Sequence, residues 1–233
     1  MHFLPKVMKP TILFCGYSDW SLKIYFFIKN KYKHKINFVI IKTQKEFNKK
    51  IKYISPALIF FVGWSWIVEK NIVNKYKCIC LHPSPLPKYR GGSPLQHQII
   101  NNEKESAVTF FVMDEFLDKG PIVRQEKLSL EGNLNEIYFR IVQKGKKGIS
   151  TIINEYLNKG IIKGKPQNER EASYYKRRTP EQSEIKIPDF RKCTARQLYN
   201  KIRALQDPYP NAFVICKNGT KLFIQKAKVE EAK

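Results

Sequence analysis

Short apolar runs alternate with amphipathic segments along the first half of the chain. The apolar runs have the length of buried strands and cover residues 11–15, 36–41, 57–62, 78–81 and 107–113. Between them, segments 21–31, 45–54 and 94–101 have the pattern of helices. Apolar strands linked by helices are typical of a parallel sheet with both faces covered. The pattern predicts an α/β fold with a mainly parallel, Rossmann-like sheet.

The second half of the chain predicts one long helix and a small mixed appendage. Asn133 and Glu136 form a capping pattern ahead of an apolar stripe, and Gly160 is a plausible helix end. A polar linker, 163–178, follows. A second capping pattern at 194–197 predicts a short helix, and the Asn-Gly pair at 218–219 predicts a hairpin. We expect a catalytic domain over 1–165, followed by a linker and a small α+β subdomain over 166–233.

The composition is that of a folded protein. The chain has 233 residues and is 42% hydrophobic, which suits one large domain or one domain with an appendage. No run approaches the roughly 18 apolar residues of a membrane helix, and the first residues lack the apolar core of a secretory signal. We therefore expect a cytoplasmic protein. The cysteines form no C-x-x-C pair, which indicates reduced thiols and no metal site; they are Cys15, Cys78, Cys80, Cys193 and Cys216.

The formal net charge is +23, from 43 Lys and Arg residues against 20 Asp and Glu residues. This charge favours polyanionic partners such as nucleic acid, a nucleotide-linked substrate or a polyglutamylated cofactor. Many of the lysines lie in stretches rich in Ile and Asn, which indicates a bias of the whole chain toward lysine on solvated faces. Charge alone does not identify the partner.

His82 is the first candidate catalytic residue. It follows an apolar run, and the prolines at 83, 85 and 87 force the chain out of the sheet directly after it. Ligands of such sheets bind outside the carboxyl ends of the strands. We therefore expect His82 to be exposed at that end. Cys80 should lie beside it on the same face, because side chains alternate along a strand.

The loop after His82 has the pattern of an anion site. Lys88 and Arg90 precede Gly91 and Gly92, and the sequence from Ser93 to Gln96 is that of a helix start with a serine N-cap. Free backbone amides at such a helix start attract anions. The alternative is that the two glycines only provide a tight turn.

Asp118 is the second candidate catalytic residue. Segment 113–118 follows the strand that ends near Met113, so we expect it at the same end of the sheet as His82. A carboxylate beside an imidazole orients it and stabilises its charged form, whereas a turn aspartate usually caps its own backbone. The first strand-to-helix turn has one glycine, Gly16, where a dinucleotide motif needs three. NAD and FAD are therefore not expected.

Segments 63–67, 82–91 and 113–120 together resemble the folate-dependent N-formyltransferases. This family includes the glycinamide ribonucleotide, methionyl-tRNA and sugar-nucleotide formyltransferases. The similarity runs in order from about Ile12 to about Phe223. Within the family, segments 177–185 and 203–213 resemble the linker and appendage of the sugar-nucleotide and tRNA branches.

The resemblance implies transfer of a formyl group from 10-formyltetrahydrofolate, without a metal, to a primary amine. His82 would donate to the oxyanion that forms when the amine attacks, and Asp118 would hold His82 and help remove the amine proton. The folate would contact Trp64, Trp66, Ile67 and Val68, together with Asp114 and Phe116. The acceptor would contact Ser84, Lys88, Tyr89, Arg90, Gly91 and Gly92.

Cys80 departs from the family pattern, which is Asn-x-His. A thiol is a weaker donor than an amide, and loss of one oxyanion donor costs about 2.7–4 kcal/mol of transition-state stabilisation. Three explanations are open: His82 and a backbone amide suffice, Cys80 serves in place of the amide, or the protein binds its ligands without efficient turnover. A separate hypothesis makes Cys80 and His82 a thiolate nucleophile pair.

Our first hypothesis for the acceptor is a nucleoside-diphosphate-linked amino sugar, such as a 4-amino-4,6-dideoxyhexose of lipopolysaccharide O-antigen biosynthesis. The enzyme would be a homodimer with neither membrane nor nucleic acid as its expected partner. This hypothesis rests on segments 63–67 and 90–96 and on an appendage shorter than a full RNA-binding barrel. One alternative is an aminoacyl-tRNA acceptor, as in methionyl-tRNA formyltransferase, which the charge favours. The other is a non-catalytic folate or nucleotide-sugar binding protein.

Overall fold

A computed structural model describes residues 9–230 of the chain. Its contacts define two compact units that interleave along the sequence. The first unit contains residues 9–82, 109–126 and 142–167, and the second contains residues 83–108, 127–141 and 168–230. The last change of unit falls at 167–168, near the predicted boundary at 165–166. That predicted division into two consecutive domains stays a prediction.

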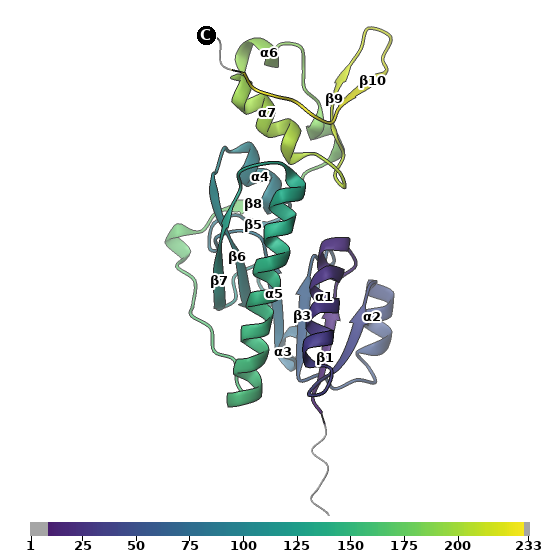
Figure 1. Ribbon diagram of the computed structural model, residues 1–233, viewed down its shortest axis with the longest axis vertical. Helices are drawn as coiled ribbons and strands as arrows, with labels where there is room; N and C mark the ends of the chain where they lie inside the picture. Colours follow the sequence, from purple (N-terminus) through teal and green to yellow (C-terminus); the bar gives the residue numbers. More distant parts are fainter. Residues whose placement is uncertain (1–8, 231–233) are drawn as a thin grey trace, which may run out of the picture. The chain divides into compact units, whose positions relative to one another are not determined.

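The first unit is built on a six-stranded sheet with the strand order β2-β1-β3-β4-β6-β7. Figure 1 labels β1, β3, β6 and β7 of this sheet. β1 to β4 pair in parallel, and β6 pairs antiparallel with β4. The predicted α/β fold with a mainly parallel sheet is therefore confirmed. β6, β7 and the long helix α5 contribute residues to both units. The strands are β1 (Thr11–Cys15), β2 (Asn37–Ile41), β3 (Leu58–Val62), β4 (Cys78–His82), β6 (Glu105–Val112) and β7 (Ile122–Ser129).

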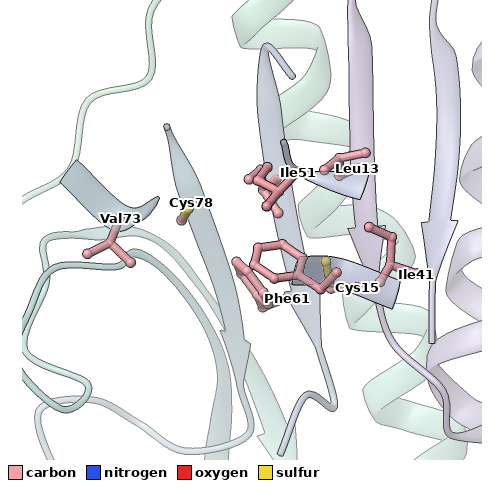
Figure 2. Packing of buried hydrophobic residues seen from close by; sticks show 9 residues of the cluster. Leu13, Cys15, Ile41, Ile51, Phe61, Val73 and Cys78 are labelled. Carbon is pink, nitrogen blue, oxygen red and sulfur yellow. The ribbon is translucent and has the colours of Figure 1, made fainter. Parts of the chain in front are cut away.

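Helices pack on both faces of this sheet. On one face, Phe47 of α2, Ile51 directly after it and Val73 of α3 close a buried cluster with side chains of the strands, among them Leu13 and Phe61 (Figure 2). On the other face, α5 lies so close to α1 and β4 that a Cβ on Gly145 would meet Ile24 and Leu81. The helices are α1 (Asp19–Tyr32), α2 (Gln44–Lys50), α3 (Lys70–Lys75) and α5 (Leu134–Lys159).

The second unit combines short helices with two small sheets. In one sheet β5 pairs with β8, and in the other β9 and β10 form the hairpin that Asn218-Gly219 predicts. Ile185, Ile202, Leu205 and Ala212 form its small buried cluster. The elements are β5 (Arg90–Gly91), α4 (Pro94–Ile100), β8 (Tyr174–Tyr175), α6 (Asp189–Lys192), α7 (Ala195–Ala204), β9 (Ala212–Ile215) and β10 (Lys221–Ile224), with 3-10 turns at Glu169–Glu171 and Pro180–Ser183.

The predicted caps at 133–136 and 194–197, and the predicted end at Gly160, lie at helix ends in the structure. Asn133 and Glu136 exchange side-chain to backbone hydrogen bonds at the start of α5, and Gly160 ends that helix with a φ of 70°. A second capping box at Thr194 opens α7. β7 was not predicted, because its sequence IVRQEKLS has four consecutive polar residues and shows neither an apolar run nor apolar/polar alternation.

Two further features of the described residues concern membrane insertion and the cysteine thiols. None of the helices in residues 9–230 combines the length and the apolarity that a bilayer crossing requires. All five cysteines are free: Cys15 and Cys78 are buried in the sheet, Cys80 and Cys193 are partly buried, and Cys216 is exposed.

Candidate active site

His82 is the last residue of β4, as the sequence predicts, but it is buried. Its side chain is only 8% exposed. Phe111 of β6, which lies opposite Cys80, packs edge-on against the imidazole with ring centroids 6.5 Å apart. The expected exposure of His82 is wrong, because Phe111 and the loop that carries Asp118 lie against its ring.

Asp118 lies beside His82, and it reaches that position by a route that differs from the predicted one. The His82 Nδ1 and the Asp118 Oδ2 are 3.7 Å apart, and the Asp118 side chain is 14% exposed. Since β6 runs antiparallel to β4, Met113 lies at the amino end of β4, where its N–H donates to Cys78 O. The segment therefore does not start at the same end of the sheet as His82. The loop after β6 folds back and brings the aspartate to the histidine.

The backbone of this loop is tightly held at Asp118 and Gly120. Asp118 has a φ of 53°, in the left-handed region that costs a non-glycine residue free energy. A Cβ on Gly120 would lie 1.7 Å from Val112 O, so only glycine fits there. Gln167 donates hydrogen bonds to the carbonyl oxygens of both residues. Sequence analysis missed Gln167, because nothing in the polar segment 163–178 distinguishes it from its neighbours.

Cys80 lies on the same face of β4 as His82 and packs against the buried cluster of Figure 2. Burial raises the pKa of its thiol well above the ordinary value, and the nearby charges of Asp118 and Cys78 raise this pKa further. The thiol therefore stays protonated at neutral pH. This geometry gives no support to a thiolate nucleophile, and it leaves Cys80 as a weak neutral donor beside His82.

The predicted folate loop after β3 carries an exposed aromatic surface. Trp64 packs on Phe61, with ring centroids 5.8 Å apart, while Trp66 lies 4.7 Å from Trp64 and is 37% exposed. Tyr17, after β1, stacks at an angle on Trp66 with a centroid distance of 5.1 Å, and its hydroxyl pairs with Ser65. Of the other two predicted residues, Ile67 is exposed and Val68 packs on the buried cluster. Tyr17 is a further residue that sequence analysis missed.

The second predicted folate segment lies in the loop that carries Asp118. Asp114 accepts a hydrogen bond from the backbone N–H of Phe116, whose ring is exposed and lies under the Lys119 ammonium group. Glu115 pairs with Lys70 at the start of α3. Exposed aromatic rings within the same unit as His82 and Asp118 suit a planar ligand such as a pterin.

In the second unit, the polar residues of the glycine-rich loop bond mainly to the unit itself. Arg90 has a fully buried side chain, and its guanidinium makes two hydrogen bonds to the Glu169 carboxylate, of 3.1 and 2.8 Å. Tyr89 donates to Glu103, and buried Ser84 donates to the Lys88 carbonyl. The Lys88 side chain is exposed.

The two glycines and Ser93 serve close backbone packing within this unit. A Cβ would lie 2.3 Å from Tyr175 O at Gly91 and 2.4 Å from the Arg177 Cα at Gly92. Ser93 precedes α4 but does not cap it, because at a φ of 52° its Oγ accepts a hydrogen bond from the Arg178 N–H. These contacts support the alternative in which the glycines serve the turn. They leave Lys88 as the residue of this loop best placed to meet an anion.

The chemistry available at this site is that of an imidazole, a carboxylate and an apolar ligand surface. Within residues 9–230, no three His, Cys, Asp or Glu side chains come close enough together to hold a metal ion. An imidazole can donate to an oxyanion, and a carboxylate can orient it and accept a proton. This arrangement suits transfer of an acyl group to an amine.

The sequence matches the formyl transferase domain over residues 28–153 and the C-terminal domain of formyl transferases over residues 179–233. The chain therefore belongs to the formyl transferase family. The methionyl-tRNA formyltransferase of Thermodesulfovibrio yellowstonii is 35% identical over 176 residues, which are 74% of this chain and 55% of the relative. That of Clostridioides difficile is 32% identical over 193 residues, which are 81% and 60% of the two chains. This chain thus spans somewhat more than half the length of these relatives.

Solved structures share the fold. Methionyl-tRNA formyltransferase from Clostridium thermocellum has a TM-score of 0.77 and 32% identity, over 92% of this chain and 97% of that one. A 4-N formyltransferase from Francisella tularensis has the same TM-score at 23% identity, over 96% and 99%. Our first hypothesis, an amino-sugar acceptor, is wrong: curated relatives at 30–35% identity are named methionyl-tRNA formyltransferases, whereas sugar N-formyltransferases resemble the chain only in fold.

Proposed function

We propose that this protein transfers the formyl group of 10-formyltetrahydrofolate to the primary amine of methionyl-tRNA. The observation that carries the proposal is the pairing of His82 with Asp118 in a chain whose curated relatives are named methionyl-tRNA formyltransferases. The formal charge of +23 supports a nucleic-acid acceptor, since phosphate contacts from Lys and Arg dominate such affinity.

His82 and Asp118 divide the work of the reaction between them. The amine nitrogen attacks the formyl carbon and loses one proton, while the bond from that carbon to the folate nitrogen breaks and this nitrogen gains a proton, so that tetrahydrofolate leaves. His82 donates to the oxyanion formed during attack. Asp118 orients the imidazole, and it stabilises the positive charge on the attacking nitrogen or accepts its proton through water. The 3.7 Å separation of the pair exceeds a hydrogen bond, as is common before ligands tighten a site.

The folate binds, in this proposal, against the aromatic surface of the first unit. Trp66 and Phe116 offer exposed rings on which a pterin can stack, and Ile67 adds apolar area. Tyr17 joins this surface, because its hydroxyl is held by Ser65 and its ring lies against Trp66. Cys80 takes the place of the family asparagine beside His82 as a protonated thiol.

The acceptor's phosphates meet basic side chains such as Lys88 rather than Arg90. Arg90 has its charge neutralised by Glu169 inside the second unit, whereas Lys88 is exposed. The homodimer and the cytoplasmic location expected from the sequence stay predictions.

The test is a formylation assay with the purified protein, 10-formyltetrahydrofolate and methionyl-tRNA, read by mass spectrometry of the released amino acid. Formylmethionine should form, and the KM for the tRNA should rise steeply with salt because counterion release drives phosphate contacts. N-acetylmethionyl-tRNA is the control, since it lacks a primary amine and should give no product. Absence of formylmethionine from a folded protein would overturn the proposal.

A further inference from the structure

Asp118 depends for its position on a segment that follows it by almost fifty residues. We infer that Gln167 is a positioning residue, which holds the Asp118 loop so that the carboxylate faces His82. The catalytic meaning of this inference rests on the proposed formyl transfer. Its structural part stands on contacts within the first unit.

A single amide group spans the turn that carries the aspartate. The Gln167 Nε2 donates to Asp118 O over 2.9 Å and to Gly120 O over 2.8 Å. An amide nitrogen carries two hydrogens, so these two bonds use its full donor capacity. The two acceptors are two residues apart, and the amide therefore fixes both sides of the turn at once.

The segment that carries Gln167 is itself fixed against the same loop. Lys165 and Ile122 exchange backbone hydrogen bonds of 2.8 Å in both directions, as in an antiparallel bridge. Directly before them, Gly164 lies so close to Pro121 that a Cβ would be 2.8 Å from the proline Cβ. The backbone of 164–167 therefore follows that of 118–122 in a fixed register. This register delivers the Gln167 amide to the turn.

The turn needs such support, because its conformation is costly. Asp118 holds a φ of 53°, a left-handed backbone conformation that costs a non-glycine residue free energy. The side chain that must meet His82 departs from this same residue. Rotation of the turn would move the carboxylate away from the imidazole, and a displacement of about 1 Å can cost about 100-fold in rate.

Gln167→Glu and Gln167→Met test the inference. Glutamate keeps the shape but places a carboxylate without donors against two carbonyl oxygens, whereas methionine removes the donors without adding charge. We expect kcat to fall roughly 10- to 100-fold in Gln167→Glu and about tenfold in Gln167→Met. The KM for methionyl-tRNA should stay within about threefold. Gln143→Glu, on the exposed surface of α5, is the matched control and should change neither constant.

A double-mutant cycle distinguishes a positioning role of Gln167 from a merely structural role. If Gln167 acts through Asp118, then Gln167→Glu added to Asp118→Asn should lower kcat by less than about threefold further. Full additivity of the two losses, with unchanged melting temperatures, would overturn the inference. So would a Gln167→Glu enzyme within about twofold of wild type.

Backbone hydrogen exchange of residues 113–122 gives a readout that needs no activity. Exchange should rise in Gln167→Glu and Gln167→Met and stay unchanged in Gln143→Glu. Unchanged exchange in both Gln167 variants would show that Gln167 does not hold the Asp118 loop. If the wild type formylates nothing but the variants show the expected exchange, the proposed function is rejected and the positioning of the loop by Gln167 stands.

Discussion

The end of β4 and the loop that follows it both have sequences that predict functional residues, but their side chains make different kinds of contact in the structure. At the end of β4 in the first unit, His82 and Asp118 lie 3.7 Å apart, and the same unit carries the exposed rings of Trp66 and Phe116. In the second unit, the loop that begins one residue later turns its polar groups inward, where Arg90 pairs with Glu169. In the proposed function the groups of the first stretch act on a ligand, whereas most polar groups of the second stretch bond within their own unit.

The difference shows that the same residue pattern can serve either ligand binding or backbone packing. A basic, glycine-rich loop has the pattern of an anion site, but its glycines can serve equally for close backbone packing. Which of these applies depends on what else packs against the loop. Here the segment from Ser173 to Arg177 occupies the space beside Gly91 and Gly92.

The largest effect should come from His82→Ala. Loss of the donor to the oxyanion and of general acid–base help should lower kcat by roughly 10²- to 10⁴-fold, while the melting temperature changes little. The comparison is with Lys88→Ala in the loop of the second unit, where kcat should hold and only the KM for tRNA should rise. Steady-state kinetics give kcat and KM for both variants. Equal losses of kcat would show that the two regions do not differ in this way.

One substitution made in both regions sharpens the contrast. Gly120→Ala places a Cβ 1.7 Å from Val112 O, so the turn that carries Asp118 must shift, and kcat should fall about 100-fold together with a loss of stability. Gly92→Ala places a Cβ against the Arg177 backbone and should cost about 1–3 kcal/mol of stability, with kcat within about threefold. Assays at 25 °C measure kcat, and thermal melts measure the stability of both variants. A large loss of kcat in Gly92→Ala with an unchanged melt would place that glycine at the reaction.

Cys80→Asn should have a smaller effect and one of opposite sign. An asparagine restores the stronger oxyanion donor of the family pattern, so formyl transfer should be retained or increased. The kcat of the variant is the measurement, with Cys78→Ser as a control that changes a buried thiol away from His82. A tenfold fall in Cys80→Asn would show that the thiol has a role of its own.

The smallest effect concerns the reactivity of the same thiol. Because burial and the Asp118 charge raise the pKa of Cys80, its thiolate form is scarce at pH 6–8, and alkylation should be slow there and increase only at strongly basic pH. Cys216, exposed in the second unit, serves as the internal reference in the same sample. Mass spectrometry after timed labelling gives both rates. Rapid labelling of Cys80 at pH 6 would revive the thiolate hypothesis.

Much of the fold follows from local patterns in the sequence. Apolar runs placed β1 to β4 and β6 to within one or two residues, and the caps at Asn133 and Thr194 set the starts of α5 and α7. β7 was not predicted, because the four consecutive polar residues in its sequence hide both strand patterns, the apolar run and the alternation. His82 at the end of β4 was also predictable, since prolines end the strand directly after it.

The sequence by itself determined most of the elements, the histidine and the family, because strand periodicity, capping and short motifs are local properties. Only the tertiary structure decided what those residues face. The antiparallel direction of β6 sets the route by which Asp118 returns to His82, and the register of Lys165 with Ile122 delivers Gln167. The partner of Arg90 likewise lies 79 residues away. Such contacts join distant segments, and their pairing depends on packing that no local pattern encodes.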